Sequence, residues 1–143
     1  MDDADHRHLT SSLQQLAAGD ADGARVTAAI ISLWREIDAA LAPVIGKRGV
    51  AALFERSLYL TRNRHPWLAD VPENNEARMD LAALTVVLQK QGSTDAASGG
   101  GAHLLALHEL LGSLIGPSLA ERLLRPAWSS PLNVAAAQGL PHD

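Results

Sequence analysis

The stretch from Thr27 to Thr61 constrains the fold of this chain more than any other part of the sequence. Its apolar residues recur at spacings of three and four, which places them on one stripe of an α-helix. The pattern is interrupted at Pro43, which lacks a backbone donor, and at Gly46, which can take the left-handed conformation that ends helices. The stretch therefore predicts two helices joined at an Ile45-Gly46 turn. The apolar positions that carry this prediction are Ile30, Leu33, Trp34, Ile37, Leu41, Val44, Val50, Leu53, Phe54 and Leu58.

Similar periodicity predicts further helices on both sides of this stretch. Residues 92–101 separate two of them and have the Gly/Ser-rich composition of a flexible connector. A chain of 143 residues is expected to form a single domain, which we place at residues 1–128, and the Pro- and Gly-containing residues 129–143 are expected to be a disordered tail. The further helices are predicted at His6–Ala18, Glu73–Gln91 and Ala102–Ile115, and from Pro117 toward Trp128. The buried stripe of the helix Ala102–Ile115 is predicted to consist of Leu104, Leu107, Leu111 and Leu114.

The resulting fold class is an all-α bundle of about five or six helices. Apolar residues make up 47% of the chain but aromatic residues only 3%, so small aliphatic side chains must fill the core and the helices must approach closely. A shift of 70 positions superposes Ile45-Gly46 on Ile115-Gly116, so the bundle reads as two helix-(Ile-Gly)-helix hairpins. A genuine duplication and two ordinary helical hairpins are both consistent with this pattern.

Charge and composition exclude several classes of protein. The formal net charge of −4 argues against general affinity for nucleic acid, and the absence of cysteine excludes disulfides and thiolate metal sites. No apolar run approaches the roughly 20 residues that span a bilayer, which argues against a membrane protein. The first residues are acidic where a secretion signal would be basic and then apolar, so we expect a cytoplasmic protein.

His108 is the first candidate for a chemical role. It is predicted at the rim of the buried stripe of its helix, and Gly112, one turn later, has no side chain to cover it. His108, Leu110, Gly112 and Ser113 resemble the histidine phosphotransfer family, whose helical bundles accept a phosphoryl group on a histidine followed by x-Leu-Lys-Gly-Ser. The likeness covers about six residues, and Leu111 stands where the family has its lysine. It implies His108 as phosphoacceptor, with Gly112 and Ser113 beside it, and a response-regulator partner. The alternative is a structural histidine partly covered by neighbouring helices.

No metal or cofactor site is predicted. His103 and His108 are five residues apart, which separates them by about 140° around a helix and prevents them from binding one ion from the same face. We find no nucleophile elbow and no zinc-protease motif, and therefore favour a non-enzymatic function.

The basic segment after Thr61 is the second candidate. Arg62, Arg64, His65 and Trp67 combine the residue types that dominate binding interfaces, and they are predicted to contact a protein partner. The alternative is that Trp67 closes one end of the bundle while the arginines lie in water.

From these features we expect an interaction or regulatory module that acts through protein–protein contacts. A homodimer is one hypothesis, because Thr27–Leu41 is apolar around most of its circumference. The phosphotransfer protein is a second, and a small-ligand sensor with its pocket between the bundle and the connector at residues 92–101 is a third.

Overall fold

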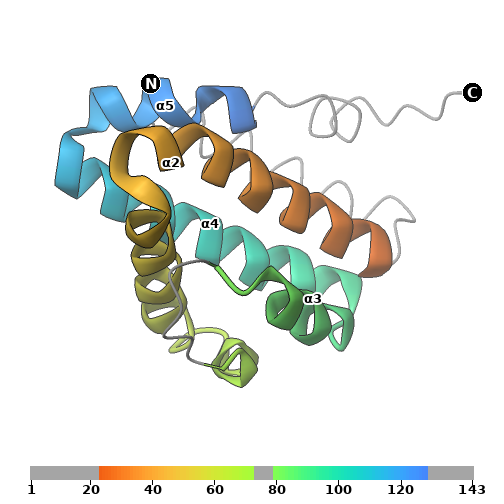
Figure 1. The fold of residues 1–143 in the computed structure, drawn as a ribbon. Helices are drawn as coiled ribbons and strands as arrows, with labels where there is room; N and C mark the ends of the chain where they lie inside the picture. Colours follow the sequence, from red (N-terminus) through yellow and green to blue (C-terminus); the bar gives the residue numbers. More distant parts are fainter. Residues whose placement is uncertain (1–22, 73–78, 129–143) are drawn as a thin grey trace, which may run out of the picture.

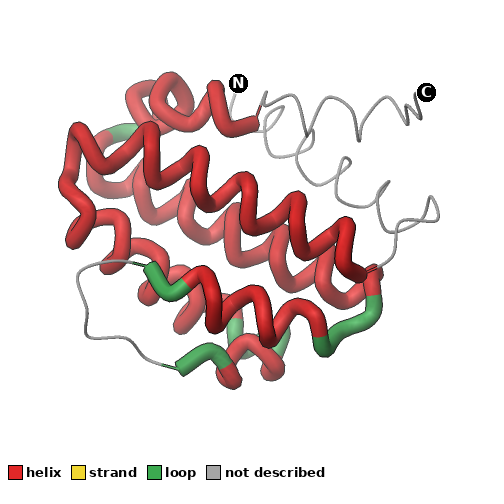
Figure 2. The backbone as a smooth tube through the Cα atoms, turned by 45° about the vertical axis from the view of Figure 1, so that its right-hand side comes forward, coloured by secondary structure: helices red, strands yellow, loops and turns green. Residues whose placement is uncertain are grey.

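The computed structural model describes residues 23–72 and 79–128, and this part of the chain is helical throughout, with short loops and no strand (Figures 1 and 2). The predicted all-α fold class is therefore confirmed. None of the described helices is long and apolar enough to cross a bilayer. The helix predicted at His6–Ala18 and the tail predicted at 129–143 lie outside the described residues. The elements are α2 (Gly23–Thr61), the 3₁₀-helix η1 (Pro66–Asp70), α3 (Leu81–Gln89), α4 (Ser93–Ile115) and α5 (Pro117–Trp128).

Helix α2 bends sharply at Gly46, three residues after Pro43. Gly46 has φ 81° and ψ 161°. This backbone conformation lies outside the helical region, and residues that carry a β-carbon rarely adopt it. The bend divides α2 into a first segment, 23–45, and a second segment, 47–61, and Figure 1 shows that the two run in different directions. The chain direction also changes at Gly116, where φ is 95°, so that α5 runs back along α4 (Figure 1).

The core forms where the first segment of α2 and helix α4 lie side by side (Figures 1 and 2). Trp34 and Phe54 are its largest residues, and their rings meet edge to face with centroids 4.9 Å apart. Burial of such rings and of branched aliphatic side chains supplies most of the stabilisation of a fold of this size. The fully buried aliphatic residues include Ile30, Ile37, Leu41, Leu68, Leu84, Leu88, Leu104 and Leu107.

Most of the apolar circumference of Thr27–Leu41 is covered within the chain itself, whereas Ala28 and Ala39 are exposed. Its large side chains, including Ile30, Leu33 and Trp34, are buried in the core. This surface, on which the homodimer hypothesis was based, is therefore not available to a second copy.

The prediction of a flexible connector at residues 92–101 is wrong, because α4 begins at Ser93 and includes Gly99 and Gly100. A β-carbon on Gly99 would stand 2.3 Å from Cζ2 of Trp67, and one on Gly100 would stand 2.3 Å from Cδ1 of Ile30. The glycines cost about 1 kcal/mol each in helix propensity, but they let these two side chains pack directly against the helix backbone. The connector on which the small-ligand sensor hypothesis was based is therefore a packed part of α4.

Helix α3 is shorter than predicted. Met79 and Asp80 are not helical, and the Asp80 side chain caps the helix by accepting a hydrogen bond from the Ala83 amide at 3.0 Å. An N-terminal aspartate of this kind satisfies a backbone donor that the helix itself leaves open. A continuous helix from Glu73 to Gln91 is therefore wrong, although residues 73–78 lie outside the described part.

Two predicted core residues are exposed: Val44 by 52% and Leu114 by 69%. Each stands two positions before a glycine bend, Gly46 and Gly116. Since the neighbouring helices cover the turns before these bends, the last turn of each stripe extends into solvent.

Candidate functional site

His108, the predicted phosphoacceptor, lies in the interior. Its exposed fraction is 3%, whereas Gly112 is half-buried and Ser113 is exposed. The prediction of a rim position is wrong because α4 contacts α2, α3 and α5, and these cover a wider arc of the helix than one apolar stripe implies. Phosphotransfer requires a partner's aspartyl phosphate to reach the imidazole, so this burial does not support it.

His103 is buried beside the two large core rings. Its ring centroid lies 4.6 Å from that of Trp34 and 5.0 Å from that of Phe54, and its Nε2 lies 3.2 Å from the Phe54 carbonyl oxygen. Because a carbonyl only accepts hydrogen bonds, Nε2 carries the proton and donates. Burial in this apolar environment lowers the pKa of His103 to about 4, against a smaller opposing effect of the Phe54 hydrogen bond. His103 is thus a neutral structural residue near pH 7.

The described residues contain no cluster of three or more His, Cys, Asp or Glu side chains that could hold a metal ion.

The four residues predicted to bind a partner are placed in different environments. Trp67 packs against Gly99 of α4, and the His65 ring meets it edge to face with centroids 6.4 Å apart. The Arg62 guanidinium lies 4.4 Å from the centroid of the Tyr59 ring. Arg64 lines a surface depression between α2 and α4. The structure therefore divides the segment into a packed aromatic part and an accessible basic part.

That depression, which we call the α2–α4 groove, has a volume of about 650 Å³. One wall is the end of α2 with the turn that follows it, and the other is a stripe along α4. The stripe residues are three or four positions apart, so they form one continuous face about 17 Å long from first to last. The α2 wall consists of Leu60, Thr61 and Arg64, and the α4 wall of Ala102, Leu105, Ala106, Glu109, Leu110 and Ser113.

The groove combines apolar walls with one charge of each sign. Arg64 lies on the α2 wall and Glu109 on the α4 wall. The Thr61 hydroxyl donates to the Ser57 carbonyl, and the described residues that line the groove include no histidine. Leu60, 41% exposed, supplies accessible apolar surface on the α2 wall of the groove. This arrangement is suited to binding.

Sequence reasoning identified Arg64 and Ser113 but missed the rest of the groove. The signal was the spacing of Ala102, Ala106, Glu109 and Ser113, which share one face of the helix. This face of α4 combines small apolar and polar side chains, and it forms a groove because it lies opposite Leu60 of α2. Neither family models, curated proteins nor solved structures give a match to this chain.

Proposed function

We propose that this chain is a non-enzymatic interaction module that binds a partner protein through the α2–α4 groove. The observation that carries the proposal is the groove itself: an accessible, apolar-walled depression with Arg64 and Glu109 on opposite sides. Exposed apolar side chains that gather beside polar ones commonly mark protein interaction sites. In the groove, the exposed Leu60 faces Leu105 and Leu110 beside Arg64 and Glu109.

The shape of the groove supports a helical partner. A three-turn stripe on α4, with a second wall from α2, resembles the arrangement in which an amphipathic helix places its apolar face into a groove. Ala102 and Ala106 are small, so the backbone of a bound helix can approach α4 closely. We propose a regulatory or accessory role because a module of this kind acts by binding a helix of another protein.

The proposal is tested by site-specific photocrosslinking in cells that express the chain. A photoreactive benzoyl-phenylalanine is placed at Ser113 in the groove, and a control chain carries it at Ala82, which is exposed on α3 and does not line the groove. We expect a discrete protein adduct at position 113 that is absent at position 82.

A blocked variant makes the result specific. Ala102→Gln with Ala106→Gln fills the α4 wall with two neutral side chains of good helix propensity. The adduct at position 113 should disappear in this background while the melting temperature is retained. Absence of any adduct at Ser113, or the same adduct at Ala82, would refute the proposal.

A further inference from the structure

We infer that the partner of the α2–α4 groove is an amphipathic helical segment with acidic residues along the flank that faces α2. This inference rests on the proposed function and adds the chemistry of the partner. It follows from the distribution of charge around the groove.

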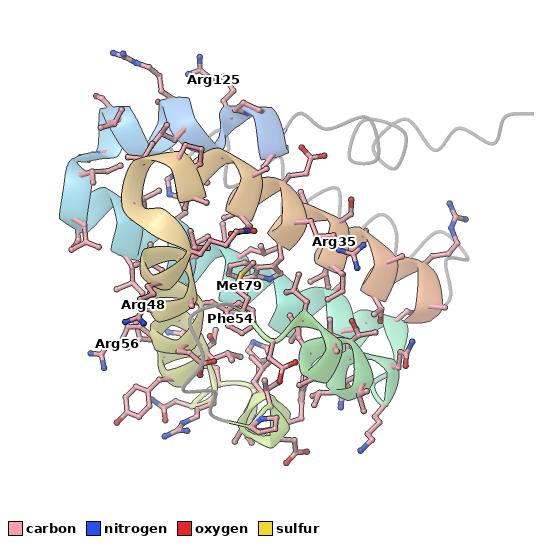
Figure 3. All side chains as sticks on the ribbon, in the orientation of Figure 1. Arg35, Arg48, Phe54, Arg56, Met79 and Arg125 are labelled. Carbon is pink, nitrogen blue, oxygen red and sulfur yellow. The ribbon has the colours of Figure 1, made fainter. Side chains whose placement is uncertain are left out.

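Four arginines lie on the second segment of α2 and in the turn that follows it, and one of them, Arg64, lines the groove. Among the described residues no ion pair joins Arg48, Arg56, Arg62 or Arg64 to an acidic side chain. Lys47, in the same segment, is by contrast paired with Asp38 at 2.9 Å. Figure 3 shows Arg48 and Arg56 pointing outward from the second segment of α2. The α2 wall of the groove therefore carries the positive charge of Arg64, with Arg56 one helical turn before Leu60.

The Tyr59 ring contacts two of these cations on the exposed side of α2. The Arg62 guanidinium lies 4.4 Å and that of Arg56 5.3 Å from the ring centroid. Contact with an aromatic face orients a guanidinium without neutralising it, so its donors remain able to bind carboxylates. Arg56 lies one helical turn before the exposed Leu60 and Arg64 one turn after it, so these two arginines flank the α2 wall, whereas Arg62 lies on another side of the helix.

The other wall differs in charge and specifies the orientation of the partner. Glu109 is exposed and is the one acidic side chain among the described residues that line the groove. An acidic side chain of the partner is attracted to the α2 wall and repelled from the α4 wall, so a bound helix should place its acids beside Arg64. Its apolar residues, at spacings of three and four, would then face Leu105 and Leu110.

A displayed library of random 16-residue peptides tests this inference on the full chain. Peptides are selected on the wild type and counter-selected on the Ala102→Gln/Ala106→Gln variant, so that only groove-dependent binders are enriched. We expect the enriched sequences to contain more Asp and Glu than Lys and Arg, with apolar residues at helical spacing. Their affinity should fall as salt is added, because the attracting charges are exposed.

A charge reversal at Arg64 tests whether this residue binds the acidic side chains of the partner. The selected peptide should bind Arg64→Glu about tenfold more weakly than the wild type, and replacing its acidic residues by lysine should reverse this order. Arg125→Glu on α5 is the matched control, because Arg125 is an exposed arginine that already pairs with Glu121 and does not line the groove. It should leave the affinity unchanged.

Several results would overturn the inference. Enrichment of neutral or basic peptides, equal binding to Arg64→Glu, or no groove-dependent peptide at all would each do so. Acidic peptides that bind the blocked variant equally well would show that the arginines attract polyanions without the groove. A crosslinked partner at Ser113 would still support the proposed function in each of these cases, so the two proposals fail independently.

Discussion

The indole ring of Trp67 occupies the space beside Gly99 that a larger residue would need, with only 2.3 Å between Cζ2 and an ideal β-carbon on the glycine. Trp67 belongs to η1 and Gly99 to α4, so this contact joins two elements that are separated along the chain. A glycine in a helix interior is unfavourable in isolation, and the packed ring explains its presence here.

Gly99→Ala should therefore destabilise the protein. Overpacking against the Trp67 ring costs about 1–3 kcal/mol, and the gain in helix propensity offsets roughly 1 kcal/mol of it. Gly112→Ala is the control in the same helix: its β-carbon would meet only Cα of Pro117 at 3.8 Å, so it should stabilise by about 0.5–1 kcal/mol. Urea unfolding measures both values, and the same sign for both would contradict the packing argument.

Replacing either bend glycine should also destabilise the fold. Gly46 and Gly116 have φ values of 81° and 95°, and a side chain at such angles costs on the order of 1–3 kcal/mol. Gly92→Ala is the matched control, since Gly92 has φ −68° and open space around it. Thermal unfolding should show a clear decrease for Gly46→Ala and Gly116→Ala and a smaller effect for Gly92→Ala.

The free energy of unfolding should depend on the protonation of His103. Its pKa is lowered from 6.5 to about 4 in the folded protein, so between these pH values the unfolded chain binds more protons. Stability therefore decreases as the pH falls from about 6.5 to 4, by up to roughly 3 kcal/mol. His103→Phe should unfold with a weaker pH dependence in this window, as measured by urea titrations at several pH values. Identical pH dependence in both proteins would contradict the burial argument.

Chemical modification should distinguish the histidines by their accessibility. Diethyl pyrocarbonate should modify His65, which is partly exposed, much faster than His103 and His108, which are buried. Peptide mass mapping gives the extent at each site, and unfolding in urea should make all three reactive. Rapid modification of His108 in the folded protein would restore the phosphotransfer hypothesis.

The fold class could be predicted because it depends on local periodicity. Trp34, Phe54 and Leu104 are core residues, as their spacing along helices indicated. The connector could not be predicted correctly, because composition describes Gly99 and Gly100 only as poor helix formers. Their helical state depends on Trp67 and Ile30, which are distant in sequence, so tertiary packing overrides propensity there.

The candidate site was harder to predict than the fold. Arg64 was identified from residue type alone, but its wall of the groove faces Ala106 and Glu109 on a different helix. Periodicity shows which residues share a face and does not show which faces meet. The predicted accessibility of His108 was wrong for a related reason, because the number of helices around α4 decides whether a residue at the rim of its apolar stripe is accessible.

The bend at Gly46 acts at a distance on the groove. The second segment of α2 extends about 21 Å from Gly46 to Leu60, so a rotation of about 10° at this hinge would shift Leu60 and the arginines near it by almost 4 Å. The position of the α2 wall therefore depends on the backbone angles of Gly46 together with the packing of Phe54 and Leu58 in the core. A mutation that changes this bend is expected to change the width of the groove while every lining residue stays the same.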